Sequence, residues 1–101
     1  MSFTIKPTFF FLDQVRQLSG QSRRLIGEKL ELIKQNPYRS KSIHSRIFSR
    51  VFRIRLDLDG KESRLIYAVI EPDIIVVCIL ERKNDYRDLE KMLLRAMRGE
   101  G

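Results

Sequence analysis

The side chains of this sequence that could do chemistry are arginines on short alternating segments, followed by one late tyrosine. They are Arg53, Arg55, Arg64 and Arg82, with Tyr86 a few residues further on. Guanidinium groups bind a phosphodiester bidentately and stabilise negative charge that develops on it. If such a site is catalytic, metal-free cleavage of RNA fits best, because the substrate's own 2′-hydroxyl attacks the adjacent phosphorus. The protein then supplies alignment, proton transfer and charge stabilisation.

The net charge of the chain is concentrated in one segment. The 101 residues include 20 Lys plus Arg and 13 Asp plus Glu, for a formal net charge of +7. Residues 38–55 contain six cations and no acid, and the remaining 14 cations and 13 acids leave only +1 for the rest of the chain. Besides Arg53 and Arg55, the cations of this segment are Arg39, Lys41, Arg46 and Arg50. A concentrated basic patch is typical of a protein whose partner has a phosphate backbone, so we expect these four residues to bind RNA. A solvated basic loop is the alternative.

Several other classes of site and of protein are excluded by composition. A single cysteine, Cys78, allows no internal disulfide, and with one histidine, His44, there are too few ligands for a structural zinc. The few acids near the Asp59-Gly60 turn do not form the carboxylate cluster of two-metal hydrolysis. No apolar run approaches a membrane span, and residues 1–12 lack the features of a signal peptide. We therefore expect one small cytoplasmic domain over residues 1–101, with no cofactor, no metal and no membrane partner.

The hydrophobic periodicity predicts the elements that position the arginines. A strand is expected near residues 3–7, and helices are expected near 11–18 and 22–35. A polar segment, 38–47, is expected to be a loop. Strands follow at 50–58, 62–70 and 74–80, the last nearly all apolar, and a helix capped by Asn84 or Asp85 ends the chain. The order β-α-α-β-β-β-α predicts an α+β domain, with a small, largely antiparallel sheet and helices packed on one face.

The turns predict which arginines share a face of the sheet. If Asp59-Gly60 is a two-residue hairpin loop, then Arg55 lies directly opposite Arg64. Arg53, Arg55 and Arg64 then share one face, while Phe52, Ile54, Leu65 and Tyr67 point into the helices. If residues 71–73 form a three-residue loop, Ile70 faces Ile74 and Arg82 lies opposite Glu62, on the same face as the other three arginines. A one-residue slip or a bulge would change this assignment.

Each of these assignments has a structural alternative. A checkerboard of diagonal pairs, in which Arg55 meets Glu62 and Asp57 meets Arg64, would make two of the arginines ordinary pairing residues. Tyr86 could stack on a base or take part in proton transfer, but it could equally open the apolar stripe of the last helix.

The same segments resemble the RelE/ParE superfamily of type II toxin–antitoxin systems. The resemblance covers the element order and three short motifs: Phe52-Arg53-Ile54-Arg55, Ser63-Arg64-Leu65-Ile66-Tyr67 and Arg82-Lys83-Asn84-Asp85-Tyr86. The RelE branch, to which the three motifs are similar, implies a ribosome-dependent endoribonuclease that cuts mRNA in the decoding site without metal. It implies that Arg53 and Arg55 bind and activate the RNA. It further implies that Arg64 and Arg82 contact the scissile phosphate, and that Tyr86 stacks on or activates the substrate.

The resemblance also implies a partner and leaves two other functions open. Toxins of this kind are held inactive by a small antitoxin, here expected to be RelB-like, whose extended segment wraps the domain. Oligomers are expected only through that complex. A ParE-like toxin that inhibits DNA gyrase without nuclease activity is one alternative, and a catalytically inactive module that binds nucleic acid is another.

Overall fold

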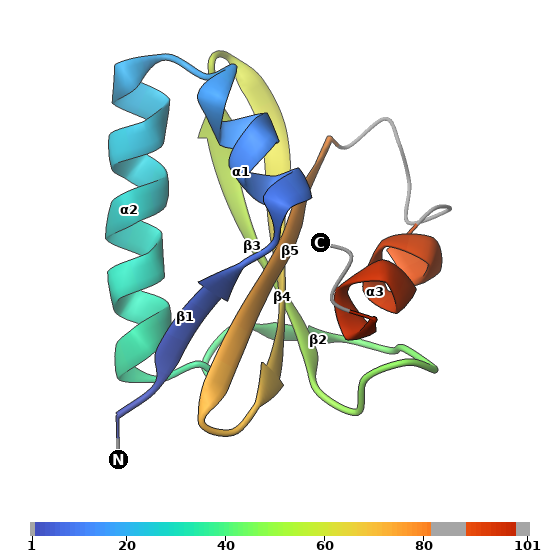
Figure 1. Ribbon diagram of the computed structural model, residues 1–101. Coiled ribbons are helices and arrows are strands. Elements are labelled where there is room, and N and C mark those ends of the chain that lie inside the picture. Colours follow the sequence, from blue (N-terminus) through green and yellow to red (C-terminus); the bar gives the residue numbers. More distant parts are fainter. Residues whose placement is uncertain (1, 82–88, 99–101) are drawn as a thin grey trace.

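The structure, a computed structural model, describes residues 2–81 and 89–98. In chain order the elements are β1 (Thr4–Pro7), α1 (Phe9–Arg16), α2 (Gly20–Gln35), β2 (Lys41–Ile43), β3 (Val51–Leu58), β4 (Lys61–Ile70), β5 (Asp73–Glu81) and α3 (Leu89–Met97). Figure 1 shows α1 and α2 on one side of the strands and α3 on the other. None of the helices in these two ranges is long and apolar enough to cross a membrane.

The strands form one five-stranded sheet in the order β1-β5-β4-β3-β2. Only β1 runs parallel to its neighbour, β5, and the other three pairings are antiparallel. The predicted α+β class and largely antiparallel sheet are therefore confirmed. The strand β2 is an addition to the predicted order, because its three residues lie in the segment expected to be a loop. Its pairing with β3 places Lys41 directly opposite Arg53.

The Asp59-Gly60 hairpin has the predicted geometry. Asp59 and Gly60 both have positive φ, 49° and 80°, as a two-residue turn with primed geometry requires. The register that follows from it, with Arg55 opposite Arg64 and Asp57 opposite Glu62, is confirmed. Hydrogen bonds to the Asp59 carboxylate also connect this turn to the start of α2. Asp59 accepts hydrogen bonds from the hydroxyls of Ser19 and Ser22 at 2.5 and 2.8 Å, where Ser19 is the N-cap of α2.

The second hairpin differs from the prediction in its turn. Ile70 pairs with Asp73, so the loop has two residues, and the expected pairing of Ile70 with Ile74 is wrong. A bulge opposite the Ile66–Tyr67 step inserts one extra residue into β5. Beyond the bulge, Ser63 pairs with Glu81, the register expected from a three-residue loop. The pairing of Arg82 with Glu62 lies outside the described residues.

The sheet is buried on both faces. Leu65, Tyr67, Ile74 and Val76 belong to a core with Phe11 of α1 and Ile26 of α2. Ile66, Ala68, Cys78 and Leu80 belong to a second core with Leu89 and Leu93 of α3. The expectation that all helices pack on one face is therefore wrong. Strand β5 is apolar on both faces, so a helix is needed on each side, and α1 and α3 supply them.

Candidate nucleic-acid interface

Four predicted cations lie together on the face of the sheet that α3 partly covers. Arg53 and Arg55 alternate along β3 and so share a face. Directly opposed residues also share a face, which adds Arg64 from β4 and Lys41 from β2. Opposed like charges destabilise a sheet by about 0.2–1 kcal/mol per pair. Two such pairs side by side concentrate positive charge on this face, which favours the binding of an anion.

The four cations differ in their burial. Lys41 and Arg55 are exposed, Arg53 is half-buried, and Arg64 is only 8% exposed. Arg64 is therefore largely covered, although it shares this face with the exposed Arg55 as predicted. Its neighbours on the same face, Ile66 and Leu80, belong to the core under α3. Arg64 is thus a buried charge at the border between that core and the cationic surface.

Arg64 has few partners for a buried guanidinium. Its Nη2 lies 3.7 Å from Glu62 Oε1, within ion-pair range but beyond hydrogen-bonding distance. Its Nε is buried and has no hydrogen-bond partner in the described part of the chain. A buried, ionised group usually satisfies its donors, because leaving one unpaired is costly. Arg64 is therefore a buried cation with an unpaired donor, and guanidinium donors form charge-assisted hydrogen bonds with oxyanions.

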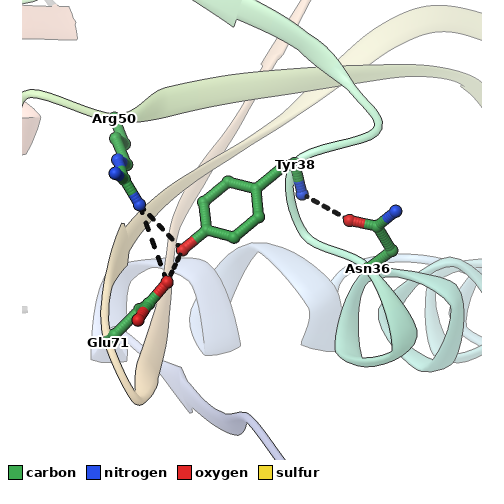
Figure 2. Close-up of polar contacts among 4 residues, drawn as sticks. All are labelled: Asn36, Tyr38, Arg50 and Glu71. Carbon is green, nitrogen blue, oxygen red and sulfur yellow. Dashed lines mark hydrogen bonds and ion pairs between the residues drawn. The ribbon is translucent and has the colours of Figure 1, made fainter. Parts of the chain in front are cut away.

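Arg50 belongs to a different cluster, at the far end of the sheet. Its Nη1 donates a hydrogen bond of 2.9 Å to the Tyr38 hydroxyl and lies 3.6 Å from Glu71 Oε1, as Figure 2 shows. Its guanidinium carbon is 5.1 Å from the centre of the Tyr38 ring. The Tyr38 hydroxyl also donates to Glu71, and this hydrogen bond raises the pKa of Tyr38. The charge of Arg50 is therefore largely paired with groups of the protein itself, and these contacts connect the segment after α2 to the β4–β5 turn.

The two remaining cations of the basic segment are also separate from the four. Arg39 lines a groove of about 290 Å³ with Lys29 and Leu32 of α2 and with Ile54. Because Ile54 lies between Arg53 and Arg55 on β3, this groove is on the opposite face of the sheet. Arg46 is exposed in the β2–β3 loop, where its backbone N–H donates to Glu90 of α3 at 3.4 Å. Arg82 and Tyr86 lie outside the described residues.

Two features of the site were missed by sequence reasoning. The direct pairing of Lys41 with Arg53 depends on β2, whose three residues carry one apolar side chain and no alternation to read. The anchoring of the hairpin by Ser19 and Ser22 was missed because the second helix was expected to begin near residue 22, whereas α2 begins at Gly20 with Ser19 as its N-cap. The hydrogen bonds from these two serines lower the pKa of Asp59. Among residues 2–81 and 89–98, no three His, Cys, Asp or Glu side chains are grouped as metal ligands.

The fold is similar to that of solved RelE toxin structures. The free-state structure of an E. coli RelE variant with two arginines replaced by alanine matches with a TM-score of 0.73 and 17% identity, over 96% of this chain and 99% of that one. The isolated E. coli RelE toxin in another crystal form matches with a TM-score of 0.63 and 18% identity, over the same shares of both chains. The intact E. coli RelBE toxin–antitoxin complex matches with a TM-score of 0.65 and 19% identity, over 80% of this chain and 96% of that one. No family model and no curated protein matches the sequence. The expected likeness to the superfamily is confirmed in the fold.

Proposed function

We propose that this protein is the toxin of a type II toxin–antitoxin system and acts as a ribosome-dependent, metal-independent endoribonuclease on mRNA. One observation carries the proposal: Lys41, Arg53, Arg55 and Arg64 share one sheet face in a chain with the RelE fold. A face that only kept the protein soluble would not need a buried arginine with an unpaired donor. The whole chain, residues 1–101, is proposed as a single toxin domain.

The proposed reaction is an internal transesterification. The 2′-hydroxyl loses its proton and its oxygen bonds to the adjacent phosphorus, while the bond from phosphorus to the 5′-oxygen breaks. The leaving oxygen takes a proton, and the phosphate becomes a 2′,3′-cyclic ester. Negative charge rises on the non-bridging oxygens in the transition state, where positioned guanidinium groups stabilise it most. Arg64 and Arg55, directly opposed across the hairpin, are the groups proposed for that role.

The other cations are proposed to hold the RNA strand on either side of that phosphate. Lys41 and Arg53 continue the cationic row toward the edge of the sheet and would bind neighbouring phosphates. Arg46, in the loop beside α3, would extend the contact. Arg82 and Tyr86 enter the proposal through the resemblance of their motif to the RelE branch, as a second phosphate-binding arginine and as a stacking or proton-transferring group.

The proposed partner in the cell is a small antitoxin. The E. coli RelE toxin, which shares this fold, was crystallised in complex with its RelB antitoxin. By analogy, a RelB-like protein with an extended acidic segment would neutralise this toxin by covering the cationic face. Electrostatic complementarity of this kind speeds association and suppresses wrong partners.

The test is to map mRNA ends in a translation reaction with purified ribosomes. Wild-type protein should give cuts at fixed codon positions, and Arg55→Ala should lower the cleavage rate about tenfold or more, because it removes a charged hydrogen-bond donor. Arg39→Ala is the matched control: it removes the same charge from the same segment but from the opposite face, and should cut at the wild-type rate. Absence of cuts, or DNA breaks that depend on gyrase, would overturn the proposal.

A further inference from the structure

One edge of the Arg64 guanidinium lacks a complete partner in the part of the chain that the structure describes. Nε has no hydrogen-bond partner, and Nη2 is 3.7 Å from Glu62 Oε1. These two nitrogens form the edge that binds a carboxylate or phosphate through two parallel hydrogen bonds. At 3.7 Å, Glu62 neutralises the charge of Arg64 without making either bond. The Nε–Nη2 edge therefore has a carboxylate nearby but no hydrogen bond from either nitrogen to it.

The geometry of β4 explains this arrangement. Glu62 and Arg64 are two residues apart on one strand, so they point to the same face with their Cα atoms about 6.6 Å apart. The Glu62 side chain is 37% exposed and the Arg64 side chain 10%. The carboxylate therefore lies nearer to solvent than the guanidinium.

We propose that Glu62 is a competing carboxylate that weakens the binding of phosphate to Arg64, an inference that rests on the proposed function of this face. A phosphate on the Nε–Nη2 edge would bring a second negative charge close to Glu62, and like charges repel most in a partly buried site. An anion that touches only Arg64 is then bound weakly. An RNA strand that also contacts Arg55 and Lys41 gains enough to overcome the repulsion. Glu62 thereby favours extended polyanions over free phosphate.

The test measures binding without cleavage. The probe is a short fluorescent oligoribonucleotide with 2′-O-methyl groups, which lacks the attacking hydroxyl, and its affinity is read by anisotropy at fixed salt. Glu62→Gln should bind it about fivefold more tightly or better, because the repelling charge is gone while the shape is kept. Asp57→Asn is the matched control. It removes one acid from the same face, directly opposite Glu62, and should change the affinity by no more than about twofold.

A second background separates the Nε–Nη2 edge from the overall charge. Arg64→Lys keeps the positive charge but has no planar edge, so the gain from Glu62→Gln should disappear in that variant. Thermal unfolding of each variant confirms its fold, and Glu62→Thr replaces Glu62→Gln if that variant is unstable. Equal gains from the Glu62 and Asp57 variants, a gain that persists with Arg64→Lys, or weaker binding by Glu62→Gln would each overturn the inference. The binding assay contains no ribosome, so its result does not depend on cleavage of mRNA. Failure of cleavage in the ribosomal assay would overturn the proposed function but leave the binding result interpretable.

Discussion

The two faces of the central sheet are built from the same strands but do different work. One face is apolar along most of its length and is covered by α1 and α2. The other is apolar only where α3 packs, and toward the Asp59-Gly60 turn it carries the opposed arginines Arg55 and Arg64. Strand alternation assigns each residue of β3 and β4 to one of these faces. A chain of this size can therefore leave part of its sheet charged, because the face under α1 and α2 and the part of the other face under α3 provide the core.

The largest effect on the free energy of unfolding should come from truncating a buried side chain in either core. Leu65→Ala on the first face and Ile66→Ala on the second remove fully buried side chains from neighbouring positions of β4. Each should lower the free energy of unfolding by about 2–5 kcal/mol, because a large buried side chain is lost and a cavity remains. Urea denaturation monitored by circular dichroism measures both values.

The pair of variants also tests whether the faces are equivalent as cores. If Ile66→Ala costs less than about 1 kcal/mol while Leu65→Ala costs several, then α3 contributes little to stability and the second face is not a true core. Thr4→Ala, an exposed substitution in β1, is the control and should stay within about 0.5 kcal/mol of wild type.

A smaller effect is expected where the first face meets the chain just after α2. The hydroxyl of Tyr67, which is fully buried, donates a hydrogen bond of 2.6 Å to the backbone carbonyl of Pro37. Tyr67→Phe keeps the ring and leaves that carbonyl without this donor, so the free energy of unfolding should fall by about 1 kcal/mol. Burial raises the pKa of Tyr67, which keeps the hydroxyl protonated and able to donate. An unchanged urea midpoint would show that water replaces the lost donor.

The sequence predicted the half of the fold that local chemistry determines. Asp59-Gly60 permits positive φ at two successive residues, and that turn alone sets the register of Arg55 against Arg64. The nearly all-apolar run of residues 74–80 predicted a strand, and β5 contains it. It did not tell which helix covers which face, because an amphipathic helix such as α3 can pack on either side.

The features that the sequence did not predict depend on pairing between distant segments. β2 is a strand because Lys41–Ile43 hydrogen-bonds to β3, and nothing in those three residues requires it. The burial of Arg64 is likewise a tertiary effect, because strand alternation predicts the face of a side chain but not what covers it. The bulge in β5 offset a turn that is one residue shorter than expected, so the predicted register holds in only one half of the hairpin.

Acid should weaken the junction between the Asp59-Gly60 hairpin and α2. Hydrogen bonds from Ser19 and Ser22 lower the pKa of Asp59, so the folded protein holds this carboxylate ionised below its ordinary range. Its contribution to stability is complete above about pH 4 and is lost as the pH falls through the lowered pKa. Asp59→Asn, which still tolerates positive φ, should be less stable at pH 7, and its difference from wild type should shrink below pH 4. Thermal unfolding from pH 3 to 7 measures this, and a constant difference would contradict it.

The smallest effect should come from the far end of the sheet, and it separates two cations that are only five residues apart. Arg50 pairs with Glu71 at an exposed site, so Arg50→Ala should change the free energy of unfolding by less than about 1 kcal/mol. Because this charge is already paired with an acid, the variant should also cleave mRNA within about twofold of the wild-type rate, in contrast to Arg55→Ala. Ribosome-dependent cleavage by the two variants, measured side by side, decides the matter. A loss with Arg50→Ala as large as that with Arg55→Ala would mean that RNA breaks the pair with Glu71 and that the interface extends to this end of β3.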